Sequence, residues 1–294
     1  MYDALKLNIG IVGYRDWAFD IYSSLHSVDF ANLTACGVKF DWLTLVNNPT
    51  AKDASFTISD PNSPEDLLNW IQRKDYKFII FVGWSWIVPE EILKSVDCLC
   101  IHPSDITKCR GGSPIQNQIL RGVDETKVTI FRMTQEIDWG PIIDQRAIRL
   151  DGYIPEIFNR IIDASVISIR SIIKNVLSGF DISAERANAE PGDLFARRKP
   201  SDSVVEIDNL KSITFEKIDR LSRCLSGPYP RLKISSSSFA CQYFEVASVI
   251  KLFNGSVNLD QMHDNFTEKH DIDFLKLKCK DGEFIAFGEY KHND

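Results

Sequence analysis

The sequence has no long apolar run, no excess of positive charge and no paired set of cysteines. Its apolar segments are far shorter than the roughly 20 residues that a membrane-spanning helix needs, and the N-terminal one is too short for a signal peptide. We therefore expect a cytoplasmic protein without membrane spans. The net charge of −7 argues against nucleic acid as the main partner, because binding phosphates requires a cationic surface. Seven cysteines, an odd number, fit a reducing compartment better than a disulfide framework.

The length and composition predict a folded protein of two domains. A chain of 294 residues exceeds what one small core organises, and its 44% hydrophobic and 26% charged residues are ordinary for globular proteins. Residues 181–203 are rich in proline, serine and charge, which is typical of a linker. We predict a larger domain over residues 1–195 and a smaller one over residues 196–294.

Short apolar strands and amphipathic helices alternate through the first domain. Strands are expected at 7–13, 41–48, 78–84, 96–102 and 128–133, and helices at 15–25, 64–73, 88–95, 113–122 and 154–177. This alternation predicts an α/β domain with a mostly parallel sheet. The second domain has a helix at about 214–226, then short strands with a hairpin turn at Asp281-Gly282, and is expected to be mainly β.

His102 and Asp138 are the first candidates for chemistry. His102 ends a predicted buried strand, and ligands of open α/β sheets bind at the carboxyl ends of strands. Asp138 lies in the loop after the next strand, so two neighbouring strand ends would bring the pair together. A carboxylate beside an imidazole fixes its tautomer and raises its basicity, which suits a general base. The alternative from spacing alone is a core histidine and a turn aspartate.

Other motifs in the chain point less clearly to a function. The Gly10–Gly13 segment lacks the glycine spacing of a dinucleotide-binding turn. Cys98, Cys100 and His102 share one face of a strand, with Cys109 nearby, but this spacing is poor for zinc. We predict no metal site.

Residues 98–143 resemble the core of the formyltetrahydrofolate-dependent formyltransferases. That family carries Asn-x-His-x-Ser-Leu-Leu-Pro, Arg-Gly, Pro-Ile, a threonine-rich strand and Asp-x-Gly, and the corresponding residues occur here in the same order. They are His102, Ser104, Arg110-Gly111, Pro114-Ile115, Thr129, Asp138 and Gly140. Later segments, ARRKPSDSVVEID and RLSRCLSGPYPRLKI, resemble the start of the C-terminal region of methionyl-tRNA and sugar N-formyltransferases.

The resemblance implies a Rossmann-like catalytic domain that uses 10-formyltetrahydrofolate as co-substrate. The formyl group would pass to an amine through a tetrahedral intermediate. His102 would accept or shuttle the amine proton, while Asp138 would orient His102 and help to protonate the leaving folate nitrogen. The implied folate-binding residues are Val82, Gly83, Trp84, Trp86, Gln135, Ile137 and Trp139. Trp84 and Trp86 would either wall the folate slot or belong to the core.

One position departs from the family pattern. Cys100 stands where the family has an asparagine whose amide supports the formyl oxygen, and a thiol is a weak hydrogen-bond donor. The resemblance leaves three replacements open: Asn117, a backbone N–H near Gly111-Gly112, or His102 as imidazolium. A related branch of sugar-modifying enzymes has an RGGSP-x-QN pattern without that asparagine, and residues 110–117 match it.

The expected acceptor is a 4-amino-4,6-dideoxy sugar linked to UDP or dTDP, as used in cell-surface polysaccharide synthesis. The substrate-binding candidates are Ser104, Arg110, Gly111, Gly112, Arg197, Arg198 and Tyr229. Arg197 and Arg198 would neutralise the diphosphate or form a solvated linker, and Tyr229 would line the acceptor pocket or brace the junction. An exposed edge of the C-terminal sheet would allow a homodimer.

Several rival functions stay open on the sequence. Methionyl-tRNA would require a basic surface and a cationic insert, which neither the net charge nor residues 47–63 supply. Glycinamide ribonucleotide transformylases share the core but lack the C-terminal continuation. Loss of the asparagine would also suit a non-catalytic folate-binding module, and hydrolytic deformylation is a further alternative on this scaffold.

Overall fold

The computed structural model describes residues 7–26, 31–61, 63–182, 190–236, 242–253, 256–257 and 273–292. The chain divides into two compact units that interleave in sequence. The first is drawn from Met1–Pro114, Glu125–Arg149 and Phe158–Phe195, and the second from Ile115–Asp124, Leu150–Ile157 and Ala196–Asp294. The domain division at residues 195 and 196 stays a prediction.

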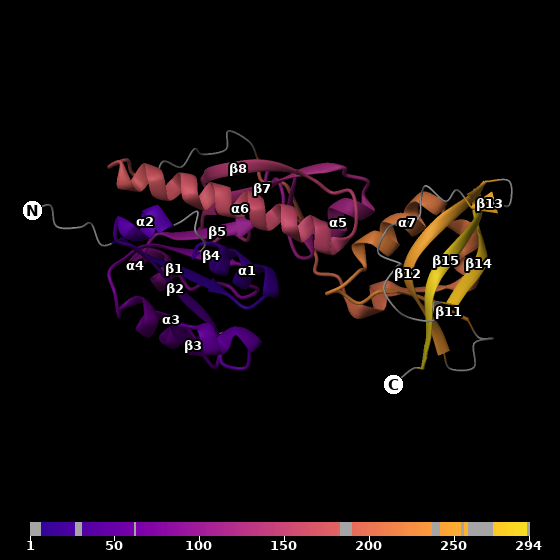
Figure 1. The fold of residues 1–294 in the computed structure, drawn as a ribbon, viewed down its shortest axis with the longest axis horizontal. Helices are drawn as coiled ribbons and strands as arrows, with labels where there is room; N and C mark the ends of the chain where they lie inside the picture. Colours follow the sequence, from indigo (N-terminus) through magenta and orange to yellow (C-terminus); the bar gives the residue numbers. More distant parts are fainter. Residues whose placement is uncertain are drawn as a thin grey trace, which may run out of the picture. The chain divides into compact units, whose positions relative to one another are not determined.

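The first unit is built on a seven-stranded sheet in the order β3-β2-β1-β4-β5-β7-β8 (Figure 1). The strands β1 to β5 run parallel, and β7 and β8 run antiparallel to their neighbours. The predicted mostly parallel, Rossmann-like fold is therefore confirmed. The strands are β1 Leu7–Gly13, β2 Val38–Leu45, β3 Phe56–Ile58, β4 Tyr76–Val82, β5 Cys98–His102, β7 Glu125–Arg132 and β8 Ile142–Arg149.

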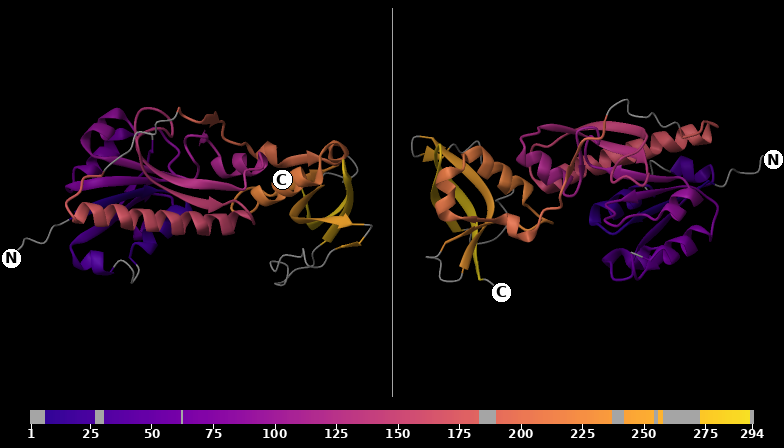
Figure 2. Two further views of the ribbon diagram at one scale, coloured as in Figure 1. Left: turned by 90° about the horizontal axis from the view of Figure 1, so that it is seen from above. Right: turned by 180° about the vertical axis from the view of Figure 1, so that it is seen from behind.

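Helices cover both faces of this sheet. The stacking of Trp17 on Phe158, with ring centroids 5.9 Å apart, places α1 and α6 on the same face, and Figure 2 shows α6 running along the sheet. The opposite face is covered by α3 and α4. The helices are α1 Asp16–Ser24, α2 Ala31–Ala35, η2 Pro49–Asp53, α3 Pro64–Ile71, α4 Glu90–Ser95, α5 Pro114–Leu120 and α6 Ile154–Leu177.

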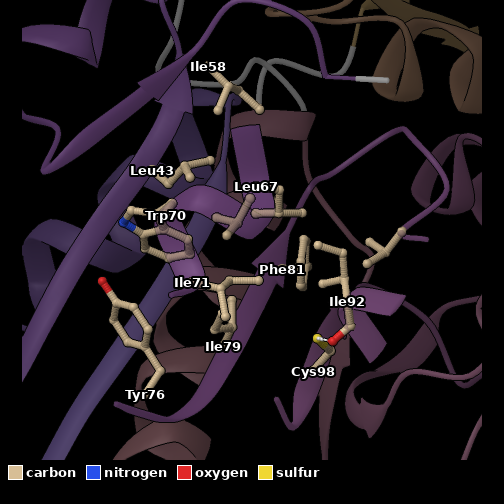
Figure 3. Close-up of a cluster of buried hydrophobic side chains, with 12 residues drawn as sticks. Leu43, Ile58, Leu67, Trp70, Ile71, Tyr76, Ile79, Phe81, Ile92 and Cys98 are labelled. Carbon is tan, nitrogen blue, oxygen red and sulfur yellow. Dashed lines mark hydrogen bonds between the residues drawn. The ribbon is translucent and has the colours of Figure 1, made fainter. Parts of the chain in front are cut away.

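A cluster of buried side chains fills the space between the sheet and α3 and α4 (Figure 3). Trp70 of α3 is nearly inaccessible and packs on Tyr76, with ring centroids 4.9 Å apart. Phe81 of β4 and Ile92 of α4 are fully buried in the same cluster. This packing holds β4 and β5 in place against α3 and α4.

The structure shifts the predicted second strand and adds strands to the first unit, β3 and β8, that were not predicted. The second strand begins at Val38 rather than at residue 41 and ends at Leu45, because Asn47 to Asp53 turn away into η2. β8 was not predicted, because its residues Ile142–Arg149 are mostly half-exposed and alternate too little to stand out from a loop. β8 nevertheless pairs with β7 along nearly its whole length.

A two-stranded parallel ribbon lies outside the main sheet of the first unit. It joins β6, Cys109–Gly111, to β9, Asp193–Phe195. The sequence suggested neither strand, since each has only three residues.

The second unit contains a largely antiparallel sheet and α7, together with α5 and the first turn of α6. The strand order is β10-β11-β12-β15-β14, with β13 paired to β12, so the prediction of a mainly β C-terminal part is confirmed. Its elements are η3 Pro200–Ser203, β10 Val204–Glu206, η4 Ile207–Ser212, α7 Phe215–Cys224, β11 Leu232–Ser235, β12 Gln242–Phe253, β13 Ser256–Val257, β14 Asp273–Cys279 and β15 Gly282–His292.

The predicted hairpin turn at Asp281-Gly282 joins β14 to β15. Asp281 accepts hydrogen bonds from the Phe215 backbone N–H at 2.7 Å and from Lys251 Nζ at 2.8 Å. The hydrogen bond from Lys251 is the main reason that the pKa of Asp281 lies below its usual value. The turn thereby ties the hairpin to the start of α7.

None of the described helices combines the length and the apolar character that crossing a membrane requires.

Candidate active site

His102 and Asp138 lie together in the first unit. His102 ends β5, is 7% exposed, and places Nδ1 3.6 Å from Oδ1 of Asp138. The distance lies within ion-pair range and exceeds that of a good hydrogen bond. The other ring nitrogen, Nε2, is buried and has no hydrogen-bond partner among the described residues. One edge of the imidazole thus faces a carboxylate, while the nitrogen on the other edge has no partner among the described residues.

The route by which Asp138 reaches His102 differs from the predicted one. We expected two neighbouring strand ends to meet, but β7 runs antiparallel to β5, and the last residue of β7, Arg132, lies opposite Leu99. The C-terminal end of β7 therefore lies beside the N-terminal end of β5, whereas His102 is at the C-terminal end of β5. The loop between Arg132 and Ile142 crosses back over this distance to carry Asp138 to His102.

The backbone of Asp138 has an uncommon conformation. Its φ angle is +47°, in the left-handed region that residues with a side chain rarely occupy. The carboxylate Oδ2 accepts a hydrogen bond from the Gly111 backbone N–H at 2.9 Å. Gly111 itself has φ of +91°, and a Cβ there would lie 2.6 Å from the carbonyl oxygen of Phe195. Glycine at residue 111 is therefore required by both its conformation and its surroundings.

Arg110 was predicted to bind the substrate, and in the structure it binds protein carbonyls. Its Nη1 donates to the Ile137 carbonyl and its Nε to the Gly192 carbonyl, both at 2.9 Å. The side chain is half-buried. These two contacts attach β6 to the loop of Asp138 and to the segment that leads into β9.

Cys100 lies on β5 two residues before His102 and is half-buried. Burial raises the pKa of its thiol well above the usual value, and the negative charge of Asp138 raises it further. A thiol held neutral is a poor nucleophile. Cys98 is similar, since burial raises the pKa of its thiol to about 12, with a smaller contribution from Asp97.

The backbone donors that we considered as replacements for the family asparagine are already engaged. Gly111 N–H bonds to Asp138, and Gly112 N–H donates to the Phe195 carbonyl at 2.8 Å. This geometry excludes both as donors to a substrate oxygen without rearrangement. Of the three candidates, His102 and Asn117 stay open.

Ser104 and Asp105 shape the turn that follows His102. Ser104 is fully buried, its hydroxyl donates to the Cys109 carbonyl, and its own carbonyl accepts from Thr129 Oγ1 at 2.7 Å. Asp105 accepts from Thr107 Oγ1 at 2.7 Å and pairs with Lys127 Nζ at 3.1 Å. Burial by itself would raise the pKa of Asp105, but these hydrogen bonds outweigh it and the pKa lies below its usual value.

Aromatic side chains gather at the carboxyl ends of β1 and β4. Trp84 and Trp86 have ring centroids 4.9 Å apart, and Trp86 packs 4.8 Å from Tyr14. The Tyr14 hydroxyl lies 2.6 Å from Ser85 Oγ, in hydrogen-bond contact. The strand order reverses between β1 and β4, which is where open α/β sheets bind ligands. The sequence had singled out both tryptophans as candidates and had left out Tyr14, although the place of Tyr14 directly after the first strand was a usable signal.

The remaining predicted folate-binding residues lie near the same strand ends or in the Asp138 loop. Val82 is fully buried at the end of β4, and Gly83 follows it with φ of +59°. In the loop, Ile137 is 52% exposed, Gln135 is exposed, and the Trp139 carbonyl accepts from Thr134 Oγ1 at 2.8 Å.

Four predicted residues belong to the second unit. Asn117 on α5 is half-buried, and its Nδ2 donates to the Ala196 carbonyl at 3.3 Å. Arg198 Nη2 donates to the Asp202 carbonyl at 2.9 Å, and Arg197 is exposed. Tyr229 is half-buried beside a cis peptide bond between Gly227 and Pro228.

Across the described ranges, no group of three or more His, Cys, Asp or Glu side chains is arranged to hold a metal ion. A small cavity is lined by Ile143, Asp144, Ser171, Ile172, Asn175, Asp181 and Ile182, and neither His102 nor Asp138 lines it. The chemistry-bearing groups are therefore not at this cavity.

Comparison with known proteins agrees with this geometry. Residues 45–154 match the formyl transferase family model. A solved methionyl-tRNA formyltransferase from Clostridium thermocellum is 26% identical with a TM-score of 0.63, over 86% of this chain and 96% of that one. Residues 45–154, which include His102 and Asp138, are therefore similar to formyl transferases. A 4-N formyltransferase from Francisella tularensis has the same fold, with 19% identity and a TM-score of 0.62 over 79% of this chain and 94% of that one.

The sequence relatives match this chain over a limited region. The methionyl-tRNA formyltransferase of Lysinibacillus sphaericus is 37% identical over 127 residues, which are 40% of this chain and 41% of that protein. The one from a Thermotoga species is 37% identical over 91 residues, 30% of this chain and 29% of that protein. The matched region thus spans less than half the length of these curated relatives, so the acceptor is not fixed by them.

Proposed function

We propose that this protein is an N-formyltransferase that moves a formyl group from 10-formyltetrahydrofolate to the amine of a nucleotide-linked 4-amino-4,6-dideoxy sugar. The observation that carries the proposal is the hydrogen-bonding environment of the two ring nitrogens of His102. Its Nε2 is buried without a partner among the described residues, while Nδ1 faces the Asp138 carboxylate. A buried, unpaired polar atom is costly, so a bound molecule is the natural partner of Nε2.

The chemistry asks for a base, because an amine attacks a formyl carbon only when it is neutral. His102 Nε2 would take the proton that the attacking amine gives up, and Asp138 would stabilise the imidazolium that results. The proton on Nε2 would then pass to the nitrogen that loses the formyl group. The same N–H can donate to the oxygen that becomes negative in between, which is the task of the asparagine that Cys100 replaces.

The formyl donor supplies the one-carbon group, and the aromatic residues at the ends of β1 and β4 suit its pterin ring. Trp84 and Trp86 are half-buried and adjacent, so each retains surface to contact a flat ring. The exposed Ile137 would cover the other side of that ring. A protein of the same fold, HypX from Aquifex aeolicus, has been solved in complex with tetrahydrofolic acid, at 14% identity and a TM-score of 0.66.

Two observations support a nucleotide sugar as the acceptor. Several proteins of this fold are sugar N-formyltransferases, including one from a Shewanella species with 18% identity and a TM-score of 0.59. The chain also carries a net charge of −7, and Lys52 is the one cation in residues 47–63, which disfavours a tRNA. Arg197, Arg198 and Tyr229 are proposed to bind the diphosphate and the base.

Methionyl-tRNA is the second candidate acceptor. It is favoured by the sequence relatives and by the Clostridium thermocellum structure, all of which are methionyl-tRNA formyltransferases. The two acceptors differ strongly in charge, so salt separates them. Turnover of tRNA should fall steeply as salt rises, whereas a nucleotide sugar with one diphosphate should be affected weakly.

The test is a turnover assay with 10-formyltetrahydrofolate and a panel of UDP- and dTDP-linked 4-amino sugars, with methionyl-tRNA in a parallel reaction. Tetrahydrofolate release and a mass gain of one formyl group on the acceptor are followed. We expect turnover on one sugar, abolished by His102→Ala and retained by His26→Ala, which removes an exposed histidine two residues beyond the end of α1. Turnover on tRNA alone would replace the sugar by the second candidate. Folate binding without turnover of any amine would favour a non-catalytic module.

A further inference from the structure

We propose that Arg110 is a positioning residue that holds Asp138 against His102, rather than a cation that binds the acceptor. The effect expected on turnover rests on the proposed function, whereas the effect expected on the loop does not. The proposal assigns a role to the arginine of the Arg-Gly pair from its contacts in this structure.

The contacts of Arg110 are made to backbone rather than to open space. Nη1 donates to the Ile137 carbonyl and Nε donates to the Gly192 carbonyl, both at 2.9 Å. A guanidinium is a rigid planar fork, so occupying two of its N–H groups in different directions fixes its orientation. Arg110 therefore links two segments that are 55 residues apart in the chain.

The bond to Ile137 acts directly on Asp138. The carbonyl of Ile137 and the nitrogen of Asp138 belong to one planar peptide group. Holding that carbonyl restrains rotation about the N–Cα bond of Asp138, which is the φ angle found at +47°. A residue with a side chain keeps such an angle only where neighbouring groups enforce it.

Gly111 holds the same aspartate from its other end. Its backbone N–H donates to Oδ2 at 2.9 Å, which leaves Oδ1 facing His102 Nδ1 at 3.6 Å. Two consecutive residues of β6 therefore hold Asp138 in place. Arg110 binds the carbonyl of the preceding residue, and Gly111 binds the carboxylate. Without the hydrogen bond from Arg110 to the Ile137 carbonyl, the backbone before Asp138 could rotate, and the carboxylate would no longer face His102 at a fixed angle.

The second hydrogen bond of Arg110, from Nε to the Gly192 carbonyl, is made to a residue that is held tightly in place. Gly192 packs so tightly on β6 that a Cβ there would lie 2.3 Å from the Lys108 carbonyl carbon. Its N–H donates to the Ile106 carbonyl at 3.0 Å. With Gly192 fixed, its carbonyl is a stationary point against which Arg110 holds the Asp138 loop.

The kinetic test compares wild type with Arg110→Gln, Arg110→Lys, Asp138→Asn and the double variant Arg110→Gln with Asp138→Asn. We expect Arg110→Gln to lower kcat on the order of 10²-fold with the acceptor KM little changed, because misplacing a catalytic group affects the chemical step. Arg110→Lys can make one of the two hydrogen bonds, so its kcat should lie between those of wild type and Arg110→Gln. In the Asp138→Asn background, Arg110→Gln should have almost no further effect, since it acts through Asp138.

A second readout does not require activity. Amide hydrogen exchange in residues 133–141 should be faster in Arg110→Gln than in wild type. The matched control is Arg223→Gln in the second unit, where Arg223 Nη1 likewise donates to backbone carbonyls, of Leu150 at 3.0 Å and Gly152 at 3.3 Å. That variant should lose thermal stability yet leave exchange in residues 133–141 and kcat unchanged.

Two results would overturn the assignment. A large rise in acceptor KM with kcat intact, additive with Asp138→Asn, would return Arg110 to substrate binding. Unchanged exchange in residues 133–141 would mean that Arg110 does not hold the loop. A wild-type protein that turns over no amine would instead contradict the proposed function, and the exchange measurement would still decide the role of Arg110.

Discussion

The backbone N–H of Gly111 donates to the Asp138 carboxylate at 2.9 Å, which joins a three-residue strand to the loop that faces His102. This bond occupies one carboxylate oxygen and leaves the other for the imidazole. The site is thus built from a strand end, a loop and a ribbon that lie apart in sequence. Four predictions follow from this arrangement and from its surroundings.

Replacing Asp138 by asparagine should lower kcat by about 10²–10⁴-fold, the usual range for losing general acid–base function. The amide cannot stabilise an imidazolium, although its oxygen can still accept from Gly111. Steady-state kinetics measure the loss, with Asp144→Asn as the control because Asp144 pairs with Arg146 at 3.1 Å, away from His102. Near-normal kcat in Asp138→Asn would remove Asp138 from the mechanism.

Replacing Gly111 by alanine should destabilise the protein more than the same change at Gly179. Both glycines have φ near +90°, where a side chain costs about 1–2 kcal/mol. A Cβ at Gly111 also meets the Phe195 carbonyl oxygen at 2.6 Å, whereas nothing lies within 4 Å of one at Gly179. Denaturant unfolding measures both variants. Equal losses would show that β9 moves aside freely and that the β6–β9 ribbon is loosely held.

Cys100 should resist alkylation at pH 8, and Cys100→Ala should cost little activity. Burial and the charge of Asp138 raise the pKa of this thiol, so it stays protonated, and a thiol is a weak donor to an oxyanion. The exposed Cys36 serves as the positive control for labelling by iodoacetamide. Mass spectrometry of peptides reads the labelling. Rapid modification of Cys100 with loss of activity would contradict this account. Cys100→Asn should raise the rate if an amide at this position supports the formyl oxygen.

Asp105, through its hydrogen bond from Thr107 and its ion pair with Lys127, should contribute stability that is lost in acid. The folded pKa of Asp105 lies below its usual value, so the contribution is present above the unfolded pKa of about 3.9 and is lost as pH falls through the folded pKa. Urea unfolding between pH 7 and pH 3 measures this. Asp105→Asn should show a flatter decline below pH 4 than wild type. Lys211→Met, which removes a largely exposed cation paired with Asp208, should leave the acid limb unchanged. Parallel curves for wild type and Asp105→Asn would mean that the ionised Asp105 carboxylate contributes nothing to stability.

The sequence by itself determined the fold class and the chemical candidates. Buried runs such as residues 78–82 form strands because apolar side chains on both faces require cover on both sides. The helix at 154–177 was predicted at its full length, since its apolar positions repeat at helical spacing. His102 and Asp138 were found in the same way, from residue types placed after strands. These features are local, and local patterns are readable in one chain.

Only the tertiary structure decided how the site is assembled. The antiparallel direction of β7 depends on pairing between distant segments, and it moves the end of that strand away from His102. The same holds for β6 and β9, which are too short to leave a pattern and exist because they pair with each other. The contacts of Arg110 with Ile137 and Gly192 could not be foreseen, because the sequence shows an arginine and its charge, whereas its hydrogen-bond partners are set by the folding of three separate segments.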